Sequence, residues 1–352
     1  MKWAAGSGCS ALSPRAQGVL CAFFGIMVLT PDTVMLRLSG NFDEFTILFF
    51  KFTFFATVIT IYSFCCNDFS VLSTYKKFKR LGRVGILAGV IWGGSNILFV
   101  CAVKRTAVAN VLTIIAMDPV VSTVLSIFLL GERVKARTYC TIAACISALL
   151  LVFASNFSSG GNAESVLGCV FALLAMISMA TYFVLLRMIS QNVAPEHAPD
   201  ILQCNVVAGM TVSAVSAVVQ LSGGCDFTAI SVQPDKAYLL VLQGVVILPL
   251  SFGLITLAPS LIPANEVSLY CLLETVIGPL FVWAAGYEVP PVYTVYGAAI
   301  LVTALAVNGF LSLREEQSEA AVNVVEVDLK IINSAVSTES KSGAEGSLEE
   351  IL

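Results

Sequence analysis

Long apolar stretches alternate with short polar ones along most of this chain of 352 residues. Ten of them hold about 20 mostly apolar residues, the length that an α-helix needs to cross a hydrocarbon core roughly 30 Å thick. Transmembrane β-strands would instead give segments of about 10 residues with alternating polarity. The pattern therefore predicts an all-α membrane protein with ten transmembrane helices. They are expected at residues 17–37, 45–64, 84–103, 107–130, 138–155, 165–187, 201–221, 237–257, 264–286 and 292–313.

Two of these stretches share a polar pattern, which indicates an internal repeat. Residues 111–134 align with residues 267–289, and each has a carboxylate in mid-segment, Asp118 in the first copy and Glu274 in the second. In each copy a glutamate follows fourteen residues later. Many secondary transporters contain such repeats and form a central site between them.

Lysine and arginine are unevenly divided between the two sides of the predicted bundle. If the N-terminus is cytoplasmic, the loops on its side hold Lys2, Arg15, Lys76, Lys77, Lys79, Arg80, Arg83, Arg133, Lys135, Arg137, Arg187 and Arg314, and the opposite loops hold only Arg37, Lys104, Arg105 and Lys236. This bias predicts that both termini are cytoplasmic. Because each copy has five helices, the copies at residues 17–155 and 165–313 must then run in opposite directions. The repeats are therefore predicted to be inverted.

Composition excludes an ordinary soluble protein. Apolar residues make up 57% of the chain, charged residues make up 12%, and the mean hydropathy is +0.89. Residues 1–16 show no cleavable signal pattern and are expected to be a short cytoplasmic segment. Residues 314–352 are acidic, which predicts a disordered cytoplasmic tail. The sequence fits the plasma membrane and an organelle membrane equally well.

The sequence carries no recognisable enzyme or cofactor motif. G-x-S-x-G, H-E-x-x-H and a Walker loop are absent, and His197 is the single histidine. The 11 cysteines lie mostly in apolar spans and lack metal-ligand spacing. The basic residues between 76 and 83 lie next to a span, where they favour a membrane anchor over a nucleic-acid site. We expect no enzyme activity, no cofactor, no metal and no nucleic-acid partner.

The two repeated segments resemble a known family. Residues 106–134 (TAVANVLTIIAMDPVVSTVLSIFLLGERV) and 265–289 (NEVSLYCLLETVIGPLFVWAAGYEV) are similar to EamA-type members of the drug/metabolite transporter superfamily. The shared pattern is a beginning rich in small residues, a proline or Glu-Pro in mid-helix, and a terminal Gly-Glu. Thr275 stands where the family has a proline, and Lys51 stands where arginine is more common. The resemblance implies ten helices in two inverted five-helix repeats and transport of small metabolites, without naming a substrate.

Four charged residues fall within the predicted spans, namely Asp32, Lys51, Asp118 and Glu274. A charge at mid-membrane costs roughly 2.5–3.5 kcal/mol on insertion scales, so such residues are usually paired or line a cavity. Asp32 and Lys51 lie at similar depths, which allows an ion pair. Lys51 could bind an anionic group of a substrate, the pair could form part of a gate, or it could be a structural salt bridge. Alternatively, Pro31 and Asp32 could simply end the first helix near the interface.

Asp118 and Glu274 fall near the middle of the fourth and ninth spans. Inverted symmetry would place both near the bilayer midplane, where substrate and coupling sites form. Because burial disfavours the charged form of a carboxyl group, either residue could exchange protons and couple transport to H+. Each could instead be a protonated carboxyl that hydrogen-bonds a neighbouring helix. Pro119 cannot donate to the helical ladder, so a local break in the fourth helix is predicted.

Aromatic and amide side chains could complete a pocket. Trp92 and Asn96 are four residues apart and share one face of the third span. Tyr182, Gln243 and Tyr270 lie on later spans, and Tyr182 aligns with Asp32 between the repeats. Each could equally be an interhelical hydrogen-bonding residue, since an unpaired polar group in lipid is costly. These five residues join the four charged ones as candidates for substrate binding or coupling.

The sequence thus predicts a secondary transporter of small organic metabolites, such as amino acids or nucleobases, that works by alternating access with proton coupling or exchange. One alternative is a sugar-phosphate or nucleotide-sugar antiporter, although Lys51 is the single lysine well inside a span. Another is a non-transporting scaffold or receptor whose tail recruits partners. The expected partners are a solute, the bilayer and H+ as a candidate coupling ion. Gly85, Gly89 and Gly93 form a small-residue stripe that favours close helix packing and leaves a homodimer open.

Overall fold

The computed structural model describes residues 13–38, 42–65, 71–106, 108–131, 136–153, 163–192, 200–223 and 234–284, with isolated positions between 296 and 314. Within these ranges every regular element is a helix and none is a strand, so the all-α prediction is confirmed for the described part of the chain. The predicted segments 1–16 and 314–352 lie largely outside these residues.

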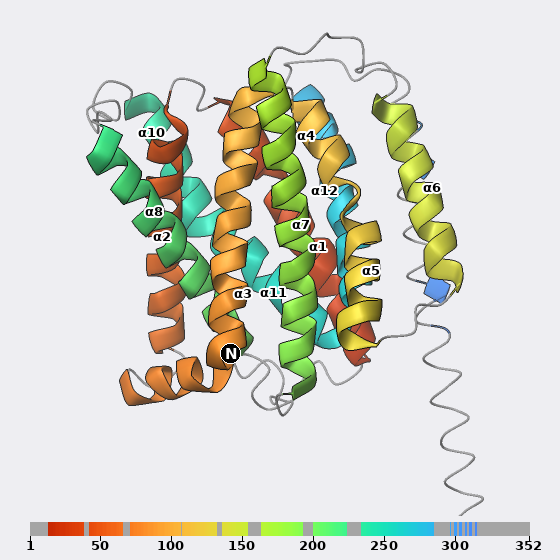
Figure 1. Cartoon of the computed structure of the whole chain (residues 1–352), viewed down its shortest axis with the longest axis horizontal. Coiled ribbons are helices and arrows are strands. Elements are labelled where there is room, and N and C mark those ends of the chain that lie inside the picture. Colours follow the sequence, from red (N-terminus) through yellow and green to blue (C-terminus); the bar gives the residue numbers. More distant parts are fainter. Residues whose placement is uncertain are drawn as a thin grey trace, which may run out of the picture. The chain divides into compact units, whose positions relative to one another are not determined.

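The helices match the first nine predicted stretches (Figure 1). They are α1 Pro14–Leu38, α2 Glu44–Cys65, α3 Val71–Arg105, α4 Val108–Ile115, α5 Asp118–Leu130, α6 Ala136–Phe153, α7 Ala163–Asn192, α8 Gln203–Gly223, α10 Pro234–Leu242, η2 Gln243–Ile247, α11 Leu248–Leu261 and α12 Ala264–Ala284. The tenth stretch, 292–313, has only isolated described positions. The ten-helix bundle, the repeat boundaries and the inverted arrangement therefore stay predictions.

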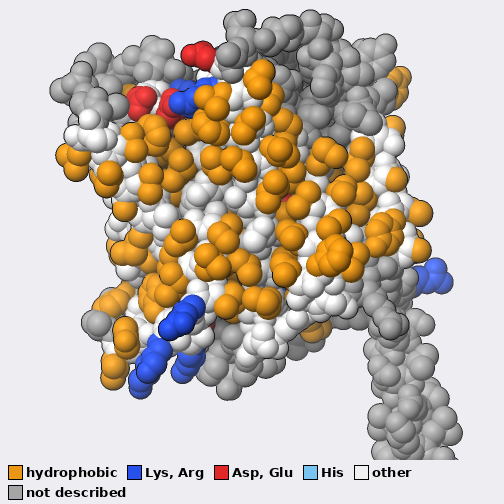
Figure 2. Space-filling view, viewed as in Figure 1, with side chains coloured by type: hydrophobic (Ala, Val, Ile, Leu, Met, Phe, Trp, Pro, Cys, Tyr) orange, Lys and Arg blue, Asp and Glu red, His pale blue; other side chains and the backbone are white. Residues whose placement is uncertain are grey.

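Six described segments are long and apolar enough to cross a membrane, judged by length and composition. They are Pro14–Leu36, Glu44–Cys65, Thr74–Arg105, Val166–Asn192, Asp200–Ser222 and Ala237–Leu261. Their outward faces carry large apolar side chains, such as Ile61, Met210 and Val218, and Figure 2 shows hydrophobic side chains over much of the visible face. An apolar surface of this extent would be unstable in water and suits lipid. The chain is an integral, multi-pass membrane protein.

Two helices of the described residues depart from simple spans, and one interruption considered from the sequence is absent. The fourth span is divided between α4 and α5 by a turn at Ala116 and Met117, directly before Asp118, so the predicted break is confirmed. The first helix instead continues through Pro31 to Leu38, so Pro31 does not end it. The third helix begins well before the predicted span and bends at Gly82, where φ is 65°. A positive φ is readily adopted by glycine, which has no β-carbon to clash.

The eighth span contains a π-helical turn, η2, between α10 and α11. The amide of Leu248 donates to the carbonyl of Gln243, five residues earlier. Pro249 follows and has no N–H, so the α-helical ladder loses a donor at this point. π-helical turns are rare and are frequent at functional sites. The turn was not predicted from the sequence.

The helices of the first compact unit, Met1–Leu305, pack in a few extensive pairs. The largest are α3 with α7 and α8, α1 with α11 and α12, and α2 with α8. A β-carbon at Gly89 would lie 2.7 Å from the Cys204 carbonyl oxygen, and one at Gly93 would lie 2.9 Å from that of Ala208. These two glycines of the stripe therefore let α3 approach the backbone of α8.

The second compact unit, Ala306–Leu352, is described at a few positions only. Val307, Phe310, Leu311 and Arg314 are helical and exposed.

Candidate functional site

A cavity lies among α1, α2, α3, α4, α7, α11 and α12. Five of the nine predicted site residues line this cavity, and the other four are not wall residues. Asp32, Lys51, Trp92, Asn96 and Glu274 line the cavity. The remaining wall residues are Ile26, Leu29, Phe52, Ser95, Phe99, Val100, Leu112, Ile115, Ala175, Met179, Phe183, Phe252, Ile255 and Cys271. The wall is thus mainly aromatic and aliphatic, with a few polar groups, as is usual for a small-molecule site.

Asp32 of α1 and Lys51 of α2 form a buried ion pair at the cavity. Lys51 Nζ lies 2.6 Å from Asp32 Oδ2, and the two side chains are 5% and 9% exposed. The pair expected from their similar depths is therefore present. Asp32 Oδ1 has no hydrogen-bond partner among the described residues. A structural role and a role in binding both remain compatible with this geometry.

The π-helical turn η2 packs against the backbone of both residues of this ion pair. Gln243 Nε2 donates to the backbone oxygen of Asp32 at 3.1 Å. A β-carbon at Gly244 would lie 2.5 Å from the Lys51 backbone oxygen, so only glycine allows η2 to pack this closely against α2. Gln243 is fully buried and absent from the cavity wall. It positions the helix that carries Asp32, and the sequence signals for this contact were Gly244 and Pro249.

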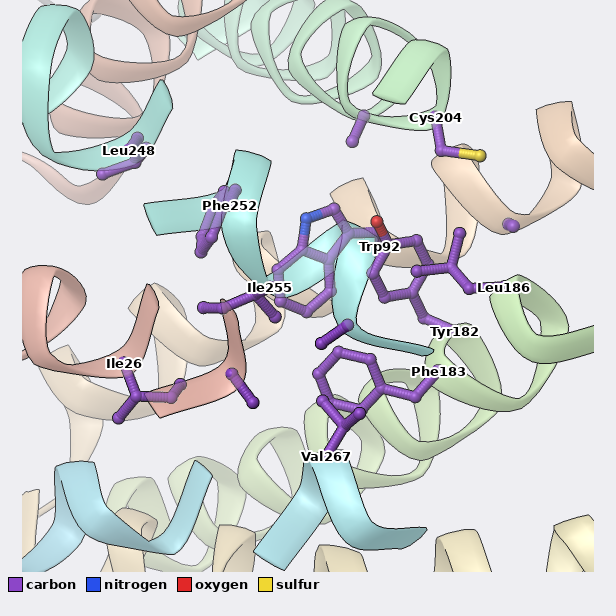
Figure 3. Packing of buried hydrophobic residues seen from close by; sticks show 14 of the residues in the cluster. Ile26, Trp92, Tyr182, Phe183, Leu186, Cys204, Leu248, Phe252, Ile255 and Val267 are labelled. Carbon is purple, nitrogen blue, oxygen red and sulfur yellow. The ribbon is translucent and has the colours of Figure 1, made fainter. Parts of the chain in front are cut away.

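Trp92 is the centre of an aromatic cluster from three helices (Figure 3). Its ring stacks on Tyr182, with centroids 4.7 Å apart and planes at 11°, and meets Phe252 edge-on at 5.0 Å. Phe183 lies 6.2 Å away. One face of the Trp92 ring is therefore covered by Tyr182, and Phe183 and Phe252 join Trp92 in the wall.

Tyr182 is fully buried behind Trp92 and is not a wall residue. Its hydroxyl donates to Asn205 Oδ1 at 3.3 Å and lies 3.0 Å from Thr256 Oγ1. Asn205 Nδ2 in turn donates to the Phe252 backbone oxygen at 3.2 Å. This buried network links α7, α8 and α11 and fixes the ring against which Trp92 stacks.

Asp118 is the first residue of α5 and lies just outside the cavity wall. It is 1% exposed, and neither carboxylate oxygen has a hydrogen-bond partner among the described residues. Ser268 of α12 lies beside it, and its hydroxyl is also unpartnered there. Cys271, which does line the cavity, lies near both Asp118 and Glu274. The two carboxylates predicted to be related by symmetry therefore flank one wall residue.

Tyr270 lies towards one end of the bundle rather than on the cavity wall. It is buried on α12, near Glu266 and Arg15. Arg15 Nη2 lies 2.5 Å from Glu266 Oε1, which ties α1 to α12. Arg15 precedes the wall residue Ile26 by eleven residues, about 16 Å along a helix.

A second ionic contact joins α3 to the turn before α8. Asp200 lies 3.2 Å from Arg80 and 3.6 Å from Lys77. A further pair, Arg105 and Glu44, joins α3 to α2 at 2.7 Å. These pairs could not be predicted from the sequence, because each joins residues that are distant along the chain.

Among the described residues, no group of three or more His, Cys, Asp and Glu side chains could hold a metal ion. The fold and the cavity together define a helical membrane protein with an internal cavity. The cavity wall is mainly aliphatic and aromatic and includes three charged side chains among the described residues. The model of the EamA-like transporter family matches residues 16–154. These residues are therefore similar to that family, which is part of the drug/metabolite transporter superfamily.

Solved structures share the fold. Among them, 29 chains match significantly. One is a crystal structure, described only as that of a protein, with a TM-score of 0.65 and 16% identity. The match covers 83% of this chain and 98% of that one. At this identity the likeness supports the fold alone. A search of curated proteins gave no match.

Proposed function

We propose that this protein is a secondary active transporter of small organic metabolites, such as amino acids, nucleobases or related solutes, rather than an enzyme. The observation that carries the proposal is the internal cavity, in which charged residues and aromatic rings from separate helices face one space within a membrane bundle. The family match over residues 16–154 points to the same class. Such a protein binds a small solute and lies in a lipid bilayer.

The proposal includes two inverted five-helix repeats, and the pattern of helix contacts supports them. An exchange of repeats would pair α1 with α7, α2 with α8, α3 with the α10 to α11 segment, and α4–α5 with α12. The extensive α3–α7 contact then corresponds to α1–α11, and the α1–α12 contact corresponds to α7 with α4 and α5. The α2–α8 and α5–α12 contacts map onto themselves. A pseudo-two-fold axis in the membrane plane would produce this correspondence.

Alternating access requires contacts between the repeats that open and close. Arg15 with Glu266, and Asp200 with Lys77 and Arg80, join the first proposed repeat to the second. By the lysine and arginine bias, all of these residues belong to the cytoplasmic end. We infer that the cytoplasmic gate is closed in this conformation and that both ionic contacts break when it opens.

Glu274 and Asp118 are the proposed coupling residues. Glu274 faces the cavity, and Asp118 is fully buried behind it, beside Ser268 of α12. A buried carboxylate is costly unless it binds a proton or a cation. Protonation of one carboxyl group and release from the other would link the proton gradient to the change of conformation.

The test is untargeted metabolomics on cells with and without the protein, followed by uptake of the leading solutes into proteoliposomes. We expect at least one small organic solute to be transported, with a saturable rate. Competition by phosphate esters would support the sugar-phosphate or nucleotide-sugar alternative instead. If deletion of residues 315–352 removed a cellular phenotype while the purified full chain moved no solute, the scaffold alternative would replace transport.

A further inference from the structure

The first part of α3 presents a basic and partly apolar face at one end of the bundle. We propose that this face binds the headgroup of an anionic phospholipid from the membrane leaflet on its side, which the lysine and arginine bias predicts to be the cytoplasmic one. The proposal goes beyond the proposed function and does not depend on transport. Three features carry it, namely the bend at Gly82, the exposed cations and the exposed apolar side chains beside them.

The bend at Gly82 separates residues 71–81 from the part of α3 that crosses the membrane. Gly82 has φ 65° and ψ −170°, which is not helical, and Figure 1 shows the residues before it running across the end of the bundle. Four basic residues fall within positions 76–80 of this short segment, and so many charges are too costly to place in hydrocarbon. An amphipathic segment of this kind lies in the membrane interface, at the depth of the lipid headgroups.

One face of residues 71–81 packs against the bundle. Phe78 packs against the hydrophobic core, and Leu81 is buried in it. Asp200 lies 3.6 Å from Lys77 and 3.2 Å from Arg80, which ties the segment to the turn before α8. These contacts fix the orientation of the segment, so its other face is held towards the surroundings of the bundle.

The other face carries exposed cations. Lys76 and Lys79 are exposed, as is Arg83 just after the bend, and none of the three forms an ion pair with another described residue. Lys76 lies three positions from Lys79 and four from Arg80, spacings at which helical side chains are neighbours, so these like charges repel one another. A bound anion would relieve the repulsion. Figure 2 shows Lys and Arg side chains gathered at the same end of the visible face, below the hydrophobic surface.

The apolar side chains beside these cations favour a lipid over a soluble anion. Leu72 and Tyr75 are 62% and 63% exposed. Together with Lys76 and Lys79 they recur at intervals of three or four positions, which places all four on one side of the helix. Helices in the interface bury such side chains at the boundary between headgroups and acyl chains, where tyrosine is enriched. An anionic headgroup joined to acyl chains is complementary to both kinds of side chain, whereas a soluble anion is complementary to the cations alone.

Native mass spectrometry of the purified full chain in detergent tests this proposal by counting bound lipid. The probes are dioctanoyl phosphatidylserine, dioctanoyl phosphatidylcholine and glycerophosphoserine, which differ in headgroup charge or in the presence of acyl chains. We expect phosphatidylserine to bind at least about tenfold more tightly than either of the others. Lys76→Gln and Lys79→Gln should each weaken its binding by about fivefold, because each removes one cation that faces the headgroup.

Two variants serve as controls for the binding test. Arg314→Gln removes an exposed cation that lies outside α3 and should leave the affinity unchanged. Lys79→Arg keeps the charge and should retain the affinity that Lys79→Gln loses. Thermal unfolding should be the same for all of these variants, because the replaced side chains are exposed.

Several outcomes would overturn the proposal. Equal binding of phosphatidylserine and phosphatidylcholine would show that the headgroup charge is not recognised. Unchanged affinity in the double variant Lys76→Gln/Lys79→Gln, or an equal loss in Arg314→Gln, would show that this face is not the site. Binding of glycerophosphoserine as tight as that of the lipid would assign the face to a soluble anion. Solute uptake is measured separately, so none of these outcomes bears on transport.

Discussion

Trp92 and Tyr182 lie face to face, with ring centroids 4.7 Å apart and planes at 11°, so a residue of α3 is fixed by one of α7. The sequence suggested both as pocket residues, but the structure gives them different places. Trp92 lines the cavity, and Tyr182 is the buried support behind it. An aromatic pair of this kind contributes about 0.5–1.5 kcal/mol beyond the area that it buries.

Two replacements of Tyr182 should therefore separate the contribution of its stacked ring from that of its hydroxyl group. Tyr182→Phe keeps the stacked ring and loses only the hydroxyl contacts to Asn205 and Thr256, for a loss of about 1 kcal/mol. Tyr182→Leu removes the ring and should lower the free energy of unfolding by more, with weaker solute binding. Thermal unfolding in detergent and solute affinity check both effects. Equal effects of the two variants would show that the stacked ring contributes nothing.

The Asp32–Lys51 pair can be tested with a double-mutant cycle. Lys51→Met and Asp32→Asn each remove one partner of a buried pair, and Lys51→Met leaves an uncompensated carboxylate that costs about 3–5 kcal/mol. The double variant should recover most of this stability, because no charge remains unpaired. Unfolding and uptake are measured together. Recovery of stability and uptake would assign the pair a structural role, whereas recovered stability with lost uptake would assign it to binding or gating.

Glu274→Gln tests the proposed coupling. Glutamine has nearly the same shape and cannot release a proton, so proton-driven uptake should fall while solute exchange persists. Uptake into proteoliposomes is compared with and without a pH gradient, with Glu164→Gln as the control. A variant whose uptake keeps the normal dependence on pH would refute a coupling role for Glu274.

The proposed cytoplasmic gate makes a prediction about local opening. Glu266→Gln weakens the partly buried contact with Arg15 that ties α12 to α1. Amide hydrogen exchange in residues 264–270 should accelerate by about fivefold, which corresponds to roughly 1 kcal/mol. Exchange in α7 should not change. Unaltered exchange at 264–270 would mean that this ion pair does not hold the end closed.

Two glycines of α3 test the contact between α3 and α8, because Gly89 lies at the contact and Gly94 does not. Gly89→Ala would place a methyl group 2.6–2.8 Å from atoms of Val207 and Cys204, whereas Gly94→Ala meets nothing within 4 Å. Overpacking of this kind costs about 1–3 kcal/mol, so Gly89→Ala should be destabilised and Gly94→Ala should not. Thermal unfolding of both variants is the measurement. Equal stabilities would show that the helices can separate without cost.

Features along the helix axis were largely predictable from the sequence. Hydropathy located the spans because a helix must cross a fixed thickness of hydrocarbon. Pro119 located the break before α5, since proline removes a backbone donor. The similar depths of Asp32 and Lys51 indicated their ion pair. Each of these inferences depends on position along the axis and not on rotation about it.

Rotation about the axis was not predictable, and it decides which residues reach the cavity. In a membrane the outward face and the packed face of a helix are both apolar, so amphipathic pattern does not distinguish them. Tyr182, Gln243 and Tyr270 could therefore be assigned to a span but not to a face. The structure puts all three outside the cavity wall. The amphipathic start of α3 before Gly82 was missed because it is too polar for a span.

The η2 turn has a consequence for comparing this chain with its relatives. A π-helical turn accommodates one residue more than the α-helix it interrupts. Deleting a single residue between Gln243 and Ile247 would restore α geometry and leave the following helix in nearly the same rotation, because the turn absorbs the extra residue. Phe252 and Ile255 would then keep their places in the cavity wall. A one-residue gap in an alignment at this point would accordingly mark a relative that lacks the turn, and with it the packing of Gln243 and Gly244, but keeps the same face of α11 on the cavity.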